Sequence, residues 1–373
     1  NLPSQGGTAD VTINGNASWS ISNVAASWLQ LNQTSGNSGS ATVQLSAGLN
    51  TTGATRSTVL TVNAANGPAR RVTVSQSNSI YPSYNLSPQA PDAAGMGSTA
   101  VQLAAKFKLG LNLGNTMEAP GGETGWGSPV ITESFIKFVK QSGFNAMRIP
   151  CAWDWHTDNK STAHIDANWL NRVKEVVAYC VNNDMYVLLN IHWDGGWLDQ
   201  NCTLLKKDSV SAKVKAFWEQ IGTAMRDFDE HLIFASCNEP VTNNAEEMNV
   251  LLSYHQTFIN AVRSTGGKNT NRCLVIQGSS ELINVNAFPT DPTPGKLMYE
   301  EHNYTPFQFT LMDGDANWGK MFYYWGAGHH STIEPDRNPN WGEESEQTKW
   351  FDKMKSMFID KNTSLPYYKQ VHN

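Results

Sequence analysis

Six short apolar runs lie between residues 107 and 304, and segments with helical periodicity separate them. In one such segment, residues 167–183, the side chains of Trp169, Val173 and Val176 share a face, which predicts a helix that covers a sheet. Repeated strand and helix units of this length favour a (β/α)8-type TIM barrel over an open doubly wound sheet. No GxGxxG follows the first run, which argues against a nucleotide-binding version of the open sheet. The runs are FKLGLNL, FNAMRI, MYVLLNI, HLIFAS, CLVIQ and KLMYEEHNY.

Residues 1–78 have a different composition, with four charged side chains, no cysteine, and many Ser, Thr, Asn and Gly residues. Short runs of alternating polar and β-branched residues recur between turn signals, which predicts a small all-β, immunoglobulin-like sandwich. Trp19 and Trp28 lie on the first runs, and we expect both rings to pack between the sheets. A surface on which sugars stack is the alternative for these two rings.

Residues 79–97 contain three prolines and no periodicity, so we interpret them as a semi-rigid linker. The predicted domains are therefore a sandwich at 1–78, a linker at 79–97 and a barrel at 98–373.

The net charge of −6 provides no basic surface for nucleic acid, and no apolar stretch is long enough to span a membrane. The N-terminus lacks the features of a signal peptide, which indicates a mature form. The five cysteines have no metal-binding spacing, and we expect most of them to be buried or unpaired.

Polar and aromatic residues follow the apolar runs at the places where parallel strands would end. In a (β/α) barrel the working residues lie there, because the loops converge on one mouth. Candidates at five run ends are hard to explain by packing alone. They are Asn115 after the first run, Arg148 in the second, His192, Trp193 and Trp197 after the third, Asn238 and Glu239 after the fourth, and His302 and Tyr304 at the sixth.

Three kinds of chemistry compete for these residues. A catalytic zinc site would use His192, Glu239 and His302, but no histidine has a neighbour at HExxH spacing. Serine hydrolase chemistry requires a nucleophile elbow, and no GxSxG occurs. A carboxyl group among Asn, Arg, His, Tyr and Trp side chains suits cleavage of a glycosidic bond, where one carboxyl protonates the leaving oxygen and a second attacks or activates water. We therefore expect no metal and no cofactor.

The motifs LNLGNTMEA, GFNAMRIP, NIHWDGGW, LIFASCNEP and EEHNYTP, in this order, resemble glycoside hydrolase family 5, and specifically its endoglucanases, over residues 98–365. The resemblance implies that Glu239 is the general acid/base, that Asn238 binds a sugar 2-hydroxyl and that Arg148 organises the carboxylates. It also implies that His302 and Tyr304 orient the nucleophile or contact the sugar beside it. The expected substrate-binding residues are Asn115, His192, Trp193, Trp197 and Trp325, although Trp193 stands where the family often has a second histidine.

The motifs ASWSIS, WLQL, SGNSGSATVQL, RSTVLTV and VTVSQS resemble the BACON domain, an immunoglobulin-like module found beside carbohydrate-active enzymes of Bacteroidetes. This resemblance covers nearly all of residues 1–78. It implies a spacer or a weak carbohydrate binder.

The family 5 resemblance also implies a nucleophilic glutamate at the end of a seventh strand, followed by an eighth strand. Aligned on Leu365 and Pro366, that position holds Val371, so we expect a barrel that is incomplete before strands 7 and 8. The possible reasons are a shortened sequence, a natural inactive protein, or a homo-oligomer that covers the open edges. The carboxylates that could substitute for the nucleophile are Glu118, Glu300 and Glu301, and alternation places Glu300 and His302 on one face.

The resulting hypothesis is endo-acting hydrolysis of β-1,4-glucan chains, retaining in lineage, by a secreted or cell-surface bacterial protein. The alternative is an inactive or weakly active barrel that binds glucan, or a barrel completed by an oligomer. The residues do not distinguish cellulose, mixed-linkage glucan, xyloglucan and mannan as substrates.

Overall fold

The computed structural model describes residues 1–4, 6–22, 26–48, 50, 55–77, 80–278, 282, 287–302, 304 and 306–339. The chain forms two compact units, the first ending at Tyr84 and the second beginning at Asn85, and each is described by itself. The position of Val371, where the family resemblance expects a nucleophile, lies outside the described residues.

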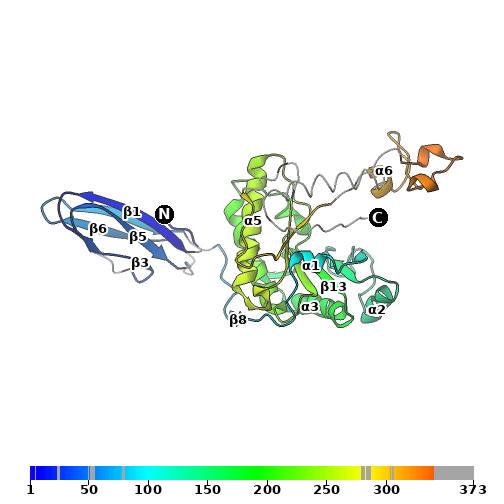
Figure 1. Ribbon diagram of the computed structural model, residues 1–373, viewed down its shortest axis with the longest axis horizontal. Coiled ribbons are helices and arrows are strands. Elements are labelled where there is room, and N and C mark those ends of the chain that lie inside the picture. The colour runs from blue at the N-terminus through cyan, green and yellow to red at the C-terminus, as the bar shows by residue number, and fades with distance from the viewer. Residues whose placement is uncertain are drawn as a thin grey trace. The chain divides into compact units, whose positions relative to one another are not determined.

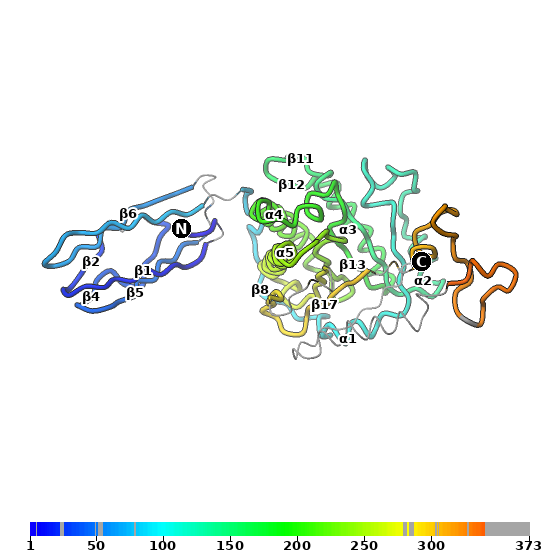
Figure 2. The backbone as a smooth tube through the Cα atoms, turned by 90° about the horizontal axis from the view of Figure 1, so that it is seen from above, coloured from blue at the N-terminus to red at the C-terminus, as the bar shows by residue number. Residues whose placement is uncertain are grey.

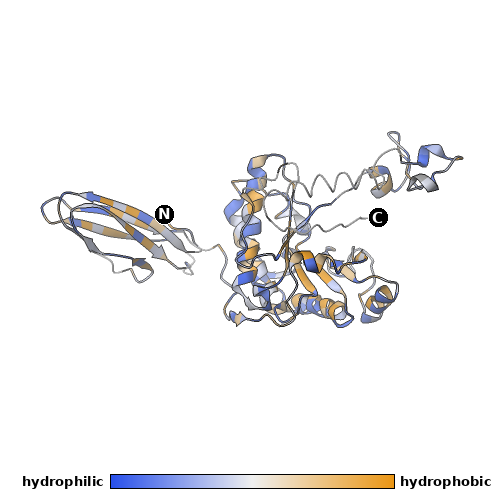
Figure 3. Cartoon of the chain, viewed as in Figure 1, coloured by the Kyte–Doolittle hydropathy of each residue, from blue (hydrophilic) through white to orange (hydrophobic). Residues whose placement is uncertain are grey.

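The first unit is a sandwich of two antiparallel sheets, as the alternating pattern predicts. One sheet has the order β1-β5-β3 and the other β4-β2-β6-β7. Figure 3 shows the alternation of hydrophobic and hydrophilic residues along these strands. The strand bounds are β1 Gly7–Gly15, β2 Trp19–Ser22, β3 Leu29–Leu31, β4 Ser35–Gly36, β5 Gly39–Ala47, β6 Arg56–Ala64 and β7 Arg70–Gln76.

The core of the sandwich contains inward side chains of both sheets, including Val43, Leu60 and Val74. Trp19 is buried in this core, which confirms the packing role expected for it. Trp28 is half-buried against the same core, and the Arg56 guanidinium lies 4.8 Å from the centre of its ring. Both tryptophans therefore pack in the sandwich.

The second unit contains the predicted parallel sheet, and its six strands lie side by side in chain order. Each strand lies inside one of the six apolar runs of the sequence, which confirms the TIM-barrel-like fold. Within the described residues the sheet does not close into a barrel. The strand bounds are β9 Gly110–Asn112, β10 Ala146–Ile149, β13 Tyr186–Asn190, β14 Leu232–Ala235, β16 Leu274–Gln277 and β17 Leu297–Glu300.

Helices cover the outer face of this sheet, and Figures 1 and 2 show them around its strands. Helix α3 contacts β13, and neighbouring contacts join α2 to α3, α3 to α4 and α4 to α5. The three residues predicted for the apolar face of α3 are all buried. The helix bounds are α1 Ala100–Ala104, α2 Glu133–Gln141, α3 Ala167–Asn182, α4 Lys207–Met225, α5 Ala245–Ser264 and α6 Phe307–Thr310.

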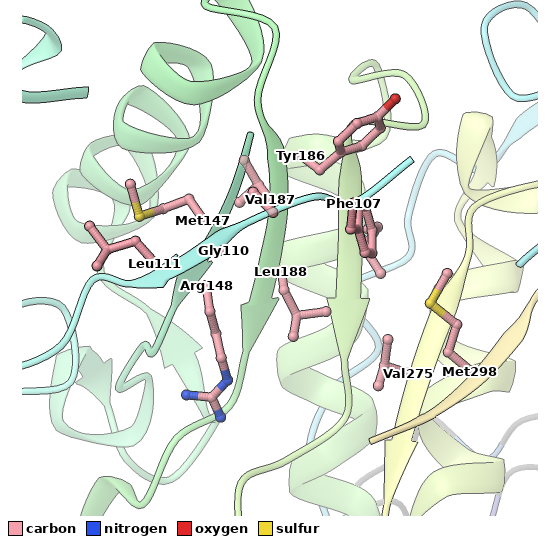
Figure 4. A pocket seen from close by; sticks show the side chains of 12 residues that line it. Phe107, Gly110, Leu111, Met147, Arg148, Tyr186, Val187, Leu188, Val275 and Met298 are labelled. Carbon is pink, nitrogen blue, oxygen red and sulfur yellow. The ribbon is translucent and has the colours of Figure 1, made fainter. Parts of the chain in front are cut away.

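The inner face of the sheet is apolar at the amino ends of the strands. Ile233, Val275 and Met298 form one cluster with Leu103 of α1, and Phe107 packs edge-on against Tyr186 with ring centroids 5.1 Å apart. A small hollow, open to solvent, remains beside these side chains. Figure 4 shows this hollow, with the Arg148 side chain extending away from the apolar lining.

Residues 85–97, which the composition assigned to a linker, belong to the second unit and make hydrogen bonds within it. Strand β8 (Gln89–Pro91) pairs with β15 (Gly266–Gly267), and the Lys296 ammonium donates to the Met96 carbonyl at 2.8 Å. All five cysteines are free and buried, as expected. Across the described residues, no helix combines the length and the apolar character that crossing a membrane requires.

Candidate active site

Polar side chains replace apolar ones at the carboxyl ends of the strands. Asn112 lies beside Arg148 in the register of β9 and β10, and Gln277 lies beside Glu300 in the register of β16 and β17. These positions share the parity of the apolar inner residues, because side chains on one face recur every second residue. The sheet thus has an apolar interior and a polar upper end.

Arg148 connects three of these strand ends. Its guanidinium donates to the Asn112 side-chain oxygen at 3.0 Å and to the Asn238 side-chain oxygen at 2.6 Å. Its Nε lies 3.3 Å from a carboxylate oxygen of Glu300. Arg148 is 5% exposed and Glu300 1%, so this is a buried ion pair. The side chain therefore holds Asn238 in place beside Glu239.

Glu239 follows β14 and has a left-handed backbone, with φ at 44°. A glutamate rarely adopts this conformation, and such backbone strain concentrates at functional sites. Its main-chain N–H donates to the side-chain oxygen of Gln277, which fixes the turn against the end of β16. The buried strand thus ends by directing Glu239 toward the open end of the sheet, where 41% of its side chain is exposed.

His302 lies between two carboxylates. Its Nδ1 is 2.6 Å from Glu239 Oε1, and its Nε2 is 2.7 Å from Glu300 Oε1. The contact with Glu300 confirms that Glu300 and His302 share a face. Burial opposes a charge on this ring, but hydrogen bonds to both carboxylates raise the pKa of His302 to about 9. The ring is therefore an imidazolium at neutral pH.

Glu239 is correspondingly ionised. Burial would raise the pKa of its carboxyl, but hydrogen bonds from His302 and Tyr304 and the charges of His302 and Arg148 lower that pKa to about 2. The Tyr304 hydroxyl donates to the same oxygen that contacts His302. His302 and Tyr304, which the resemblance assigned to a nucleophile or the sugar beside it, thus both contact Glu239 in the described structure.

The Glu239–His302 ion pair predicts a stability maximum between the ordinary pKa values of the two groups. The pKa of His302 is raised, so its contribution to the free energy of unfolding is complete below about pH 6.5 and is lost toward about pH 9. The pKa of Glu239 is lowered, so its contribution is complete above about pH 4.5 and is lost toward about pH 2. We expect His302→Asn to flatten the alkaline slope in urea unfolding. Equal slopes for both proteins would contradict the ion pair.

His192 and two tryptophans border this site. His192 lies just after β13, and burial together with the charge of Arg148 lowers its pKa to about 3, so its ring is neutral. The Asn190 amide lies 3.3 Å from His192 Nδ1. Trp193 is 44% exposed, and its ring packs edge-on against Trp155 with centroids 5.5 Å apart. An exposed ring beside the mouth is suited to stacking on a sugar.

Asp194 is a site residue that the sequence analysis did not identify. Its buried carboxylate accepts hydrogen bonds from the main-chain N–H groups of Trp153 and Trp155 at 2.7 and 3.0 Å, and from the Trp197 indole at 3.3 Å. Burial raises the pKa of Asp194 to about 6 despite these bonds. Asp194 therefore ties the loop that carries Trp155 to the loop that carries Trp197. Gln277 was also missed, although its parity with the inner face could have indicated it.

The remaining candidates do not join this network. The exposed Asn115 has a left-handed backbone with φ at 59° at the end of β9. Trp325 packs on Phe309, with ring centroids 4.8 Å apart. Of the carboxylates considered as substitute nucleophiles, Glu118 accepts main-chain N–H groups of Asn115 and Thr116. Glu300 is engaged by Arg148 and His302, as described above, and Glu301 interacts with Tyr299.

Two family models match this chain. The cellulase model, glycosyl hydrolase family 5, matches residues 112–366, and the BACON model matches residues 17–77. A xyloglucan-specific endo-beta-1,4-glucanase of Bacteroides ovatus is 33% identical over 344 residues, which are 87% of this chain and 67% of that protein. Endoglucanase B of Clostridium cellulovorans is 34% identical over 237 residues, which are 59% of this chain and 53% of that protein. The chain thus spans two thirds and about half of these relatives.

Solved structures show the same relationship. The Bacteroides ovatus GH5 xyloglucanase, in complex with a XXXG heptasaccharide, has a TM-score of 0.67 and 31% identity, and the match covers 98% of this chain and 81% of that one. A GH5 xyloglucan-specific beta-1,4-glucanase from a ruminal metagenomic library, in complex with XXLG, has a TM-score of 0.65 and 36% identity over 72% of this chain and 75% of that one. The chain therefore belongs to glycosyl hydrolase family 5, with a BACON domain ahead of its family 5 domain.

Proposed function

We propose that this protein acts on β-1,4-glucan chains as an endo-acting glycoside hydrolase with Glu239 as the general acid/base. The observation that carries the proposal is the placement of Glu239 and Asn238 at the open end of the sheet. Arg148 orients Asn238, while His302 and Tyr304 hold Glu239. Asn238 would bind the sugar 2-hydroxyl beside the bond that breaks, and His192, Asn115, Trp193, Trp197 and Trp325 would line the subsites.

The proton on Glu239 is the main chemical requirement of this proposal. A general acid has to be protonated when the substrate binds, yet the Glu239 carboxyl is ionised by its contacts with His302 and Tyr304. A second carboxylate about 5 to 5.5 Å away, as in retaining enzymes, would raise the pKa of Glu239 by like-charge repulsion and would also attract the hydrogen bonds of His302 and Tyr304. We infer that the active arrangement includes such a carboxylate.

A second candidate function is glucan binding without hydrolysis. The side-chain contacts of Glu118, Glu300 and Glu301 favour it. Each of these carboxylates already contacts other groups of the protein, whereas a nucleophile would be accessible to the sugar beside Glu239. The subsites could still hold a sugar chain through Asn238 and the exposed Trp193 ring. Glucan binding uses the same residues at the open end of the sheet and requires no proton transfer.

The two functions differ in whether new reducing ends form. We expect purified protein to release reducing ends from xyloglucan, mixed-linkage glucan or soluble cellulose and to lower the viscosity of the polymer early, as an endo-acting enzyme does. Xyloglucan is the first polymer to test, because the relatives from Bacteroides ovatus and the ruminal library are xyloglucan-specific. Mannan is the control backbone. Retention of the protein on these polymers without new reducing ends would favour the binding function.

We further propose that the protein works outside the cell, since polymeric glucans do not enter cells, and that the BACON domain acts as a spacer or a weak glucan binder. We also propose the domain boundaries 1–78 for the sandwich, 79–97 for the linker and 98–373 for the barrel. Formation of a homo-oligomer stays a prediction, and a molar mass by light scattering that does not change with concentration and equals one chain would contradict it.

A further inference from the structure

Glu300 is a carboxylate that substrate cannot reach. It lies at the carboxyl end of β17 and is 1% exposed, so any role in catalysis has to act through its neighbours. One oxygen, Oε1, lies 2.7 Å from His302 Nε2 and 3.3 Å from Arg148 Nε. Glu300 thus lies between two cationic side chains. Burying a carboxylate costs free energy of folding unless it is paired with a cation, and here both cations are within reach.

The ring of His302 makes the role of Glu300 specific. A neutral imidazole carries one N–H, so it can donate to one carboxylate only and turns a lone pair toward the other. Both ring nitrogens of His302 lie within 2.7 Å of a carboxylate oxygen, one from Glu239 and one from Glu300. An ionised carboxylate accepts and does not donate, so with both carboxylates ionised each ring nitrogen carries an N–H. Glu300 therefore affects the charge of the His302 ring, and through that ring the carboxylate of Glu239.

We propose that Glu300 is a positioning residue that acts through His302, holding the ring doubly protonated and thereby fixing the carboxylate of Glu239 at the mouth of the sheet. The charge state of the ring is a property of the free protein. Only the effect of Glu300 on turnover rests on the proposed function of the protein.

The other charged groups near the ring support this role. Arg148 approaches from β10 and disfavours a charge on His302, and His192 approaches after β13 as a neutral ring. Glu239 favours the charge, and the Tyr304 hydroxyl donates to the same oxygen of Glu239 that the ring contacts. With a neutral amide at position 300, Arg148 and His302 would face each other as two cations. His302 would then lose its second proton more easily, and Glu239 would lose its charged partner.

Nitrogen NMR of histidine-labelled protein tests the proposal without substrate. The signal of His302 is identified by its absence in His302→Asn. We expect both ring nitrogens of the native protein to be protonated at neutral pH, and we expect Glu300→Gln to lower the pKa of His302 by about one to three units. The matched control is Glu301→Gln, the adjacent residue, which interacts with Tyr299 and should leave the His302 signal in place.

A singly protonated His302 ring in the native protein at neutral pH would overturn the proposal, and so would an unchanged His302 titration in folded Glu300→Gln. If Glu300→Gln does not fold, the native measurement alone decides. A protein that is inactive on every glucan but has a doubly protonated His302 would reject the proposed hydrolysis and support this inference. The two ideas therefore fail separately.

Discussion

Replacing Glu239 with Gln should reduce hydrolysis of any glucan substrate by about 10²- to 10⁴-fold, which is the usual contribution of a general acid or base. The amide has nearly the same shape as the carboxyl but cannot transfer the proton. Asn238, Arg148 and Trp193 remain in place, so we expect binding of a cello-oligosaccharide to persist. Initial rates of reducing-end release measure the first effect, and calorimetry measures the second.

The matched control for this variant is Glu246→Gln. Glu246 is exposed in the first turn of α5, seven residues along the chain, and its substitution should leave the rate unchanged. Full turnover by Glu239→Gln would reject Glu239 as the acid/base. Loss of binding together with turnover would instead show that the carboxylate holds the sugar or the site itself.

The fold could be predicted because burial repeats with a period. Trp169, Val173 and Val176 recur at helical spacing and are all buried in α3. The six strands lie in continuous apolar runs for a different reason, since a strand of a covered parallel sheet is packed on both faces. Residues 85–97 were assigned to a linker because they lack periodicity. Their hydrogen bonds within the second unit join residues distant in the chain, and composition does not report such contacts.

The position of the site in the fold could be predicted from the sequence, but the contacts between its side chains could not. The end of a parallel strand places Glu239 and His302 at the mouth, whatever their partners are. Their pairing depends on which side chains reach across the sheet, and there His302 contacts Glu239 and Glu300. Trp325 packs on Phe309, and its place in a subsite stays a prediction. A loop without periodicity provides no rule for the direction of its side chains.

The largest effect on stability should come from Arg148→Met. This substitution leaves Glu300 buried without its guanidinium partner and removes a donor from both Asn112 and Asn238. Breaking a buried pair in this way costs about 3–5 kcal/mol of the free energy of unfolding. The described helices all belong to the second unit, so urea unfolding followed by the helix signal in circular dichroism reports on that unit.

A surface pair and a double variant show whether burial is the cause. Lys137→Met breaks the exposed pair with Glu133 on α2, and such pairs contribute about 0.3–0.5 kcal/mol. Glu300→Gln combined with Arg148→Met removes the buried charge that keeps only His302 as its partner in the single variant. The double variant should therefore lose less stability than the sum of the two single variants, because much of the cost comes from a buried carboxylate that has lost its guanidinium partner. Strict additivity would mean that Arg148 stabilises the sheet through Asn112 and Asn238 alone.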